Sequence, residues 1–311
     1  MPQDRILVLG ASGFVGRGLV DTLARAGHGI IALARRTPAP AYAANVEVIT
    51  ASLDNSTLIE GLLPTCNAVF HVASDSTPGT TASQPALEAG LNLLPTLRFL
   101  ESLQKFPNVP LVYLSSGGAI YQPVASGGLT ESCVAEPPSY YGAGKVAIEN
   151  FINAFVRQHN GRALILRPSN FYGPGQHFRR GFGLLPTLFR HAVNKTPVSI
   201  WGDGEIVRDY LFMDDFLSLC LAIAASDFAF SRFEVCNAGS GTGHSINQVC
   251  ALVEQITGTS LDRKYLPSRS VDLTRIVLDS TRANRLFGWS ATTPLPTGVS
   301  KSWHWYLNHA Q

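Results

Sequence analysis

Short apolar runs alternate with stretches of helical periodicity through the first 116 residues. Between the first two runs, Val15, Leu19 and Leu23 fall on one helical face, and Gly27 supplies the stop of that helix. The runs themselves are rich in β-branched and aliphatic residues, as strands are: RILVLG, GIIALA, VEVIT, AVFHVA and LVYLSS. Strands that alternate with helices indicate repeated βα units. The pattern therefore predicts an α/β fold built on a parallel sheet.

The second half of the chain carries two more strand-like runs, ALILR at 163–167 and FEVCN at 233–237. A stretch rich in proline and glycine begins at Pro168, between these runs. We expect the chain to leave the sheet there and to build a second lobe. The chain is thus divided into a first domain at 1–168, with later returns near 212–237, and a smaller lobe at 169–311.

Composition and charge restrict the function classes. The 311 residues are 45% hydrophobic, enough for a sizeable core, and 24 Lys and Arg against 22 Asp and Glu leave a net charge of +2. That charge argues against nucleic acid or an anionic membrane as the main partner. No apolar stretch suggests a signal peptide or a membrane span, so we expect a soluble cytoplasmic protein. The cysteines lack the short paired spacing of a zinc site, which favours free thiols, and no residue cluster suggests a catalytic metal.

A glycine-rich segment, GASGFVG, directly follows the first predicted strand and opens the first predicted helix. It places Gly10, Gly13 and Gly16 at the spacing of a dinucleotide-binding turn. The first glycine permits the tight turn, the second lets the backbone approach a pyrophosphate, and the third lets helix and strand pack closely. The strand before the segment and the helix after it favour a dinucleotide site over a plain turn.

The end of the second predicted strand bears on the choice of cofactor. An NAD site usually carries Asp or Glu there, which accepts hydrogen bonds from the ribose hydroxyls. This chain has Arg35 and Arg36 instead. Two guanidinium groups suit a ribose 2′-phosphate, so the sequence favours NADP, with NAD as the alternative if the arginines are only solvated surface residues.

Tyr141 and Lys145 lie four residues apart at the start of a predicted helix. Residues at this spacing share a helical face, so the lysine ammonium is expected to lower the pKa of the phenol from its usual value of about 10. An isolated pair of this kind is most often a surface feature. Only its context makes it a candidate for acid–base chemistry.

Three further motifs supply that context. SSGGAIY ends the fifth strand, RPSNFYGPG follows the sixth, and WGDGEIVRDYLFMDD comes later. With these motifs in this order, the chain resembles the extended short-chain dehydrogenase/reductase family, in its nucleotide-sugar epimerase and dehydratase branch, from Arg5 to about Trp305. The resemblance implies a Rossmann-type doubly wound parallel sheet of about seven strands, with a smaller, interleaved C-terminal lobe that binds a nucleotide-diphosphate sugar. It also implies a homodimer, the common assembly of the family.

The resemblance implies roles for single residues as well. Tyr141 is the expected acid–base, and Lys145 is expected to bind the nicotinamide ribose. Substrate contacts are expected from Asn170 near the diphosphate, from Arg208 and Arg269 on the diphosphate, and from Asp272 near the nucleotide ribose. Cofactor contacts are expected from Gly10, Gly13, Phe14, Val15, Gly16, Arg35, Arg36, Ser52, Leu53, Val72, Ala73, Tyr141, Lys145 and Pro168.

The chain departs from the family pattern at the end of the fifth strand. The family has Ser or Thr four residues before the tyrosine of that motif, where this chain has Gly117. Ser116 is the nearest hydroxyl, and it is either the catalytic replacement, which also contacts the substrate, or a structural serine at the strand end. The Asp-Glu pair that dehydratases use reads Gly118 and Ala119 here, which disfavours dehydration.

Two other positions differ from common family residues. Pro95 replaces a glycine in the fourth helix and is expected to kink or shift that helix. Ile276 falls where a tyrosine restricts the sugar pocket of some epimerases. It either leaves room for a 2-acetamido sugar or packs in the core of the second lobe.

The most specific interpretation is an NAD(P)-dependent nucleotide-sugar epimerase that acts at C4 through a 4-keto intermediate. An NADPH-dependent reductase of 4-keto-6-deoxy nucleotide sugars needs the same tyrosine and lysine and is the main alternative. A catalytically silent nucleotide-binding regulator is a third, which Tyr141 and Lys145 argue against and Gly117 argues for.

Overall fold

The computed structural model describes residues 5–36, 42–124, 126–179, 181–268 and 273–309. Its large sheet consists of β1 (Arg5–Leu9), β2 (Gly29–Ala34), β3 (Val46–Thr50), β4 (Ala68–His71), β5 (Leu111–Leu114), β6 (Ala163–Pro168) and β10 (Phe233–Ala238). The helices around this sheet are α1 (Phe14–Arg25), α2 (Ser56–Leu62), α3 (Pro85–Glu88), α4 (Leu94–Leu103), α5 (Gly117–Ile120), α6 (Tyr140–His159), α8 (Met213–Ala225) and α10 (Thr281–Phe287).

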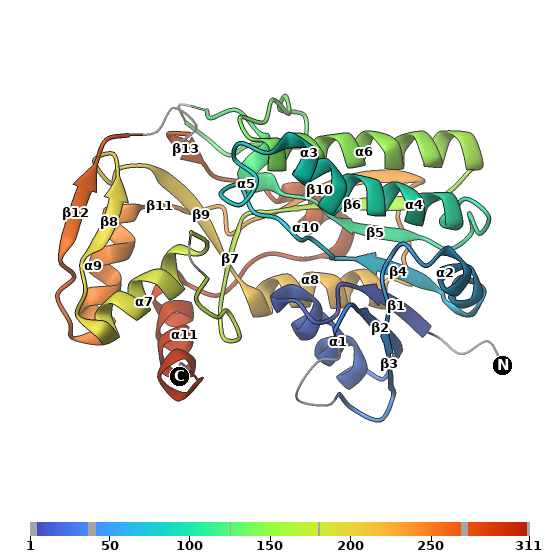
Figure 1. Ribbon diagram of the computed structural model, residues 1–311, viewed down its shortest axis with the longest axis horizontal. Coiled ribbons are helices and arrows are strands. Elements are labelled where there is room, and N and C mark those ends of the chain that lie inside the picture. The colour runs from blue at the N-terminus through green and yellow to red at the C-terminus, as the bar shows by residue number, and fades with distance from the viewer. Residues whose placement is uncertain (1–4, 37–41, 125, 180, 269–272, 310–311) are drawn as a thin grey trace.

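The seven strands run parallel in the spatial order β3-β2-β1-β4-β5-β6-β10 (Figure 1). Each of the seven runs predicted from the sequence forms one of them, so the α/β prediction is confirmed. Strand order reverses between β1 and β4. In open parallel sheets, ligands bind beyond the C-terminal ends of the strands at such a reversal.

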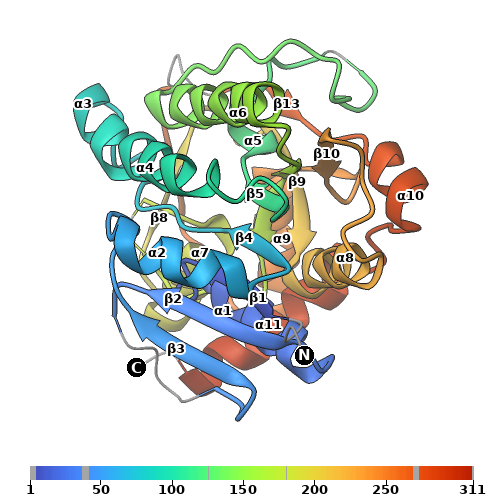
Figure 2. The same cartoon turned by 90° about the vertical axis from the view of Figure 1, so that its right-hand side faces the viewer.

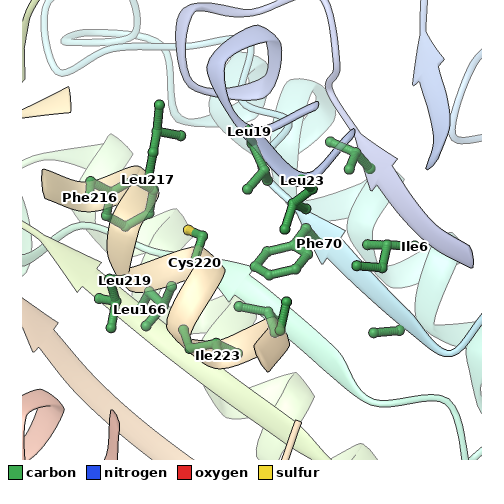
Figure 3. Close-up of a cluster of buried hydrophobic side chains, with 14 of the residues drawn as sticks. Ile6, Leu19, Leu23, Phe70, Leu166, Phe216, Leu217, Leu219, Cys220 and Ile223 are labelled. Atoms are coloured by element: carbon green, nitrogen blue, oxygen red, sulfur yellow. The ribbon is translucent and has the colours of Figure 1, made fainter. Parts of the chain in front are cut away.

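Helices cover both faces of this sheet (Figure 2). Ile6 and Val8 of β1 pack in a core with α1 and α8, whereas Leu7 and Leu9 pack in a second core with α2, α4 and α6. In the first core, Leu19 and Leu23 of α1 lie near Cys220 of α8 (Figure 3). Because both sheet faces are buried, the strands read as continuous apolar runs instead of alternating ones.

The smaller lobe is built around β9. Its elements are β7 (Asn170–Tyr172), α7 (Leu184–Asn194), β8 (Val198–Trp201), β9 (Val207–Phe212), β11 (Gly243–Ser245), α9 (Ile246–Thr257), β12 (Arg263–Leu266), β13 (Arg275–Ile276) and α11 (Leu295–His309). Strand β9 pairs with β11 in antiparallel fashion and with β7 and β13 in parallel, while β8 and β12 form a separate pair. Helices α7, α9 and α11 contribute to a third core beside these strands (Figure 1).

Three smaller expectations concern single features. Residues Ala89–Leu93 form a π-helical turn, and Pro95 lies in the first turn of α4, so the fourth helix is locally shifted as expected. All five cysteines are free, and four of them are buried. In the described part of the chain, none of the helices combines the length and the apolar character that a membrane crossing requires.

Candidate active site

The structure gathers the expected cofactor residues at one edge of the large sheet. They follow the C-terminal ends of parallel strands: Gly10, Gly13, Phe14, Val15 and Gly16 after β1, Arg35 and Arg36 after β2, Ser52 and Leu53 after β3, Val72 and Ala73 after β4, and Pro168 at the end of β6. Tyr141 and Lys145 reach the same region from α6, as the contacts below show.

The glycine-rich turn has no room for side chains at two of its three glycines. Gly10 has a φ of +90°, and a Cβ there would lie 2.6 Å from the backbone of Ala73. A Cβ at Gly16 would lie 2.1 Å from the carbonyl oxygen of Gly10. Gly13 is exposed at the N-cap of α1. The backbone at this helix N-terminus can therefore approach an anionic group closely, as a pyrophosphate requires.

A carboxylate lies at the end of β2 after all, although it comes from another strand. Arg35 donates to the Oδ1 atom of Asp75 at 2.5 Å, and Asp75 follows β4, 40 residues along the chain. Arg36 is exposed beside it. The position in the sequence that usually holds this carboxylate is therefore occupied by arginine, and a carboxylate reaches it through a long-range pairing.

The start of α6 brings the expected acid–base group to the end of β5. The Ser139 side chain caps the helix by accepting from the Gly142 amide at 3.2 Å. Tyr141 then lies in the first turn, and its phenol is hydrogen-bonded to the side chain of Ser116. Ser116, one residue before Gly117, therefore supplies the hydroxyl beside the tyrosine.

Lys145 anchors the same helix to β5. Its side chain is buried, and Nζ donates to the carbonyl oxygen of Leu114 at 2.9 Å and to the phenol of Tyr113 at 3.3 Å. Nζ also lies 5.8 Å from the centre of the Tyr141 ring. His71 of β4 is buried, with its ring 5.3 Å from that of Tyr113. Burial and the Lys145 charge lower the pKa of His71 to about 3, so this ring stays neutral.

The pKa values of Tyr141 and Lys145 follow from burial. Burial raises the pKa of Tyr141 to about 12, against the Ser116 hydrogen bond and with the help of the Glu88 carboxylate. Burial also lowers the pKa of Lys145 to about 8, although Glu88 and Glu149 favour its charged form. The pKa of the phenol is therefore raised in the protein alone, not lowered as expected, because desolvation dominates.

Two glycines after β5 lie against other parts of the site. A Cβ at Gly117 would lie 2.6 Å from Leu278 and 2.8 Å from the Arg167 carbonyl oxygen, so a larger residue would have to displace both of them. A Cβ at Gly118 would lie 3.3 Å from the Oδ1 atom of Asn170. This contact places Asn170, at the start of β7, next to the segment that carries Ser116.

A buried polar network lies on the next turn of α6. Ser115 donates to the carboxylate of Glu149, which also accepts from Arg167 at 3.1 and 2.5 Å. Arg167 donates further to the Tyr121 phenol at 2.8 Å, and that phenol donates to Asn237 at 2.8 Å. The network ties α6 to β6 and β10 behind the reaction centre.

The expected diphosphate-binding residues are only partly described. The guanidinium of Arg208 on β9 donates to the carbonyl oxygen of Leu273 at 2.7 Å. Both Arg269 and Asp272 lie outside the described residues. Ile276 is 1% exposed and packs with Ile120 and Leu278. It is a core residue, so the expectation that it leaves room for a 2-acetamido sugar is wrong.

Sequence reasoning missed three residues of this site: Asp75, Glu88 and Tyr113. Asp75 and Tyr113 meet Arg35 and Lys145 through contacts between distant segments, and Glu88 approaches α6 at Gly144, far along the chain. Of the three, only Glu88 could have been noticed in the sequence. It is a carboxylate that interrupts an apolar helical segment, and carboxylates are rarely buried.

Comparisons with known proteins agree with this geometry. Residues 6–239 match the model of the NAD-dependent epimerase/dehydratase family. The chain belongs to this family. A UDP-glucose 4-epimerase of Mycolicibacterium smegmatis is 28% identical over 316 residues, with 99% of this chain and 100% of the relative covered.

Solved structures of family members have the same fold over their whole length. The UDP-glucose 4-epimerase of Thermotoga maritima with UDP-glucose is 28% identical, with a TM-score of 0.89 over 99% of this chain and 100% of that one. MoeE5 in complex with UDP-glucose and NAD is 27% identical, also with a TM-score of 0.89, over 99% and 100% of the two chains. The predicted family is confirmed. The protein is an NAD-dependent enzyme of the nucleotide-sugar epimerase branch.

Proposed function

We propose that this enzyme epimerises a nucleotide-diphosphate sugar at C4 through a 4-keto intermediate. The observation that carries the proposal is the hydrogen bond between Ser116 and Tyr141, beside the buried ammonium of Lys145. Two hydroxyl groups and a fixed cation at the end of a central strand can bind a sugar hydroxyl and remove its proton. The names of the relatives, UDP-glucose 4-epimerases among them, support a UDP-hexose as the substrate.

Tyr141 acts first as a base and then as an acid in this mechanism. Ser116 donates a hydrogen bond to the C4 oxygen, and Tyr141, as the phenolate, takes the hydroxyl proton. A nicotinamide held at the glycine-rich turn would accept the hydride from C4, so that the C4–O bond becomes a carbonyl. The ketone then turns in the pocket. The hydride returns to the opposite face of C4, and Tyr141 gives its proton back to the oxygen. Lys145 keeps α6 docked on β5 and places a positive charge near the phenolate.

The residues at the sheet edge fit the dinucleotide that this chemistry needs. A Cβ at Gly10 or Gly16 would fill the turn that cradles the pyrophosphate, and Gly13 leaves the N-terminus of α1 open. When bound, an oxidised nicotinamide ring supplies a hydride acceptor that can return the hydride, and its positive charge favours the ionised tyrosine.

Arg208 is our candidate for the substrate diphosphate. A guanidinium binds phosphate oxygens with two parallel hydrogen bonds, and Arg208 lies on β9 of the smaller lobe, where its guanidinium donates to the carbonyl oxygen of Leu273. Dehydration is disfavoured, because Gly118 and Ala119 provide neither of the carboxyl groups that the elimination of water requires.

The reduction of a 4-keto sugar is the alternative that the exposed Arg36 at the end of β2 favours, since such enzymes consume NADPH. The test incubates the purified protein with UDP-galactose and a catalytic amount of NAD or NADP. We expect UDP-glucose to appear in the NMR spectrum up to equilibrium, with no net change in the nicotinamide absorbance. Stoichiometric oxidation of NADPH with a 4-keto nucleotide sugar, and no interconversion of the two hexoses, would establish the reductase instead.

A further inference from the structure

A buried carboxylate lies against the reaction helix without a direct cationic partner. Glu88, the last residue of α3, is 3% exposed. Its Oε2 atom accepts from the Thr81 hydroxyl at 2.8 Å, and its Oε1 atom accepts from the Asn92 amide at 2.7 Å. Both donors are neutral, and no ion pair of Glu88 occurs within the described residues. Burial of a carboxylate without a bonded cation is costly and calls for a reason.

The carboxylate touches α6 between Tyr141 and Lys145. A Cβ at Gly144 would lie 3.0 Å from Oε1 of Glu88, so glycine is the residue that lets the two elements approach. The charge of Glu88 acts on both neighbours: it raises the pKa of Tyr141 and favours the charged form of Lys145. The carboxylate is therefore part of the electrostatic environment of the reaction centre, although the mechanism above does not use it.

Glu88 also fixes the segment that follows β4. Asn92, which donates to Glu88, donates to the Ser76 hydroxyl at 2.7 Å and accepts from the Asp75 amide at 2.8 Å. Thr81, at the other end of this segment, donates a hydrogen bond to Glu88. Residues 75–81 thus connect the Arg35 pair at the cofactor side with Glu88 and, through Glu88, with α6.

We propose that Glu88 is a positioning residue of the reaction centre, which balances the charge of Lys145 across α6 and ties residues 75–81 to that helix. This role rests on the proposed function, in which a charged Lys145 supports the ionised Tyr141. Among the residues that the structure describes, one other carboxylate acts on Lys145, that of Glu149, which is already bonded to Arg167. Glu88 is thus the carboxylate left to stabilise the ammonium.

The main experiment replaces Glu88 by Gln, which keeps the shape and removes the charge. The titratable groups around the pair are Tyr141, Lys145 and Glu149 on α6, Tyr113 on β5 and His71 on β4, and His71 stays neutral above about pH 3. Without the carboxylate, the pKa values of both Tyr141 and Lys145 should fall. Both limbs of the pH profile of kcat/KM should then move to lower pH, by about one unit for charges several ångströms apart.

The Lys145 titration is also measured without turnover, by NMR of isotope-labelled lysine with the Lys145→Met variant for assignment. Glu101→Gln on α4 removes an exposed carboxylate of the same size and should shift nothing. If the Lys145 midpoint moves but no epimerase activity exists, the proposed reaction fails and the role of Glu88 in setting the Lys145 charge stands. If Glu88→Gln lowers kcat equally at every pH and leaves the Lys145 midpoint in place, Glu88 has only a structural role and the proposal is wrong.

A second pair of variants decides the case in which Glu88→Gln does not fold. If the unbalanced Lys145 charge causes that failure, the double variant with Lys145→Met should fold again. A double variant that also fails to fold would show that the protein needs Glu88 only for its hydrogen bonds with Thr81 and Asn92, and would overturn the proposal.

Thr81→Val removes one hydrogen bond that holds residues 75–81 and keeps the Glu88 charge. This variant should raise KM without moving either limb of the pH profile. A shift of the limbs would contradict the assignment of the pH effect to the Glu88 charge.

Discussion

Lys145 and Glu149 lie one turn apart on α6, and both are buried, yet they belong to different polar centres. Within the described part of the chain, the hydrogen-bond partners of the Lys145 ammonium are two neutral oxygens, the Leu114 carbonyl and the Tyr113 phenol. Glu149 instead receives two hydrogen bonds from Arg167, which raise the pKa of that guanidinium against the effect of burial. The Lys145 ammonium has no hydrogen-bonded counter-charge, and its pKa lies at about 8. Arg167 and Glu149, in contrast, form a hydrogen-bonded ion pair.

The two neighbouring serines that follow β5 show the same division. Ser115 is buried and donates to Glu149, while Ser116 is partly exposed and bonds to Tyr141. One residue of displacement along an extended chain turns the side chain to the other side. Both polar centres therefore lie between α6 and the segment that follows β5. Ser116 and Tyr141 belong to the reaction centre, and Ser115 and Glu149 belong to the stabilising network.

Removal of the phenol should have the largest effect, and on turnover alone. Tyr141→Phe deletes the group that exchanges a proton with the sugar, so we expect kcat to fall by about 10² to 10⁴. The unfolding midpoint should stay near that of the native protein, because the phenol makes one hydrogen bond at a partly exposed site. The initial rate of UDP-galactose conversion and a urea titration measure the two effects. Retention of more than about a tenth of the native rate would refute the acid–base role of Tyr141.

Removal of the Arg167 guanidinium should have the opposite effect and lower stability instead of turnover. Arg167→Met leaves the Glu149 carboxylate buried and unpaired, which should lower the free energy of unfolding by about 3 to 5 kcal/mol. Arg98→Met, which breaks an exposed pair with Asp54, is the control and should cost no more than about 1 kcal/mol. Equal losses in the two variants would mean that the buried network is not a separate stabilising centre.

The two serines offer a matched test of the division itself. Ser116→Ala removes the hydrogen bond that Ser116 donates to the C4 oxygen in the proposed mechanism, so kcat should fall by about 10- to 100-fold with little change in stability. Ser115→Ala removes a donor from a buried carboxylate and should cost about 1 to 3 kcal/mol of unfolding free energy, with kcat of the folded protein unchanged. An exchange of these phenotypes would reverse the assignment of the two hydroxyls.

The comparison also explains which parts of the molecule could be predicted from the sequence. The glycine-rich turn is local: Gly10, Gly13 and Gly16 meet each other within one turn, so spacing alone predicts the geometry. The seven strands are predictable for a similar reason, because burial on both faces makes each one a continuous apolar run.

The electrostatics of the site depend on contacts that no local pattern encodes. Tyr141 and Lys145 share a helical face as predicted, but the partner of the ammonium is decided by where β5 lies beneath α6. The pairing of Arg35 with Asp75 likewise joins the ends of β2 and β4, which the sequence separates by 40 residues. The fold and the identity of the candidate acid–base were therefore accessible, while the direction of the Tyr141 pKa shift was not.

A smaller effect is expected at the cofactor end, where the charges are exposed. We infer that Arg35 and Arg36 favour NADP by binding its 2′-phosphate, so replacement of both by Ala should weaken NADP binding by about 1.5 to 3 kcal/mol. NAD binding, measured by the same calorimetric titration, should change little. Equal weakening for both cofactors, or tighter binding of NAD by the native protein, would contradict the preference.

The smallest effect is expected from Asp75, whose pair with Arg35 is the exposed counterpart of the Glu149 pair. The two side chains are 65% and 31% exposed, so Asp75→Asn should change the unfolding free energy by less than about 1 kcal/mol. The substitution releases the Arg35 guanidinium and removes a negative charge that would repel a phosphate. NADP affinity should therefore rise several-fold relative to NAD, by a factor that shrinks as salt is added. Because the Asp75 amide and its bond to Asn92 are unchanged by the substitution, residues 75–81 should keep their place. A loss of affinity for both cofactors would instead mean that the carboxylate shapes the binding site, and that its pairing with Arg35 has no part in cofactor choice.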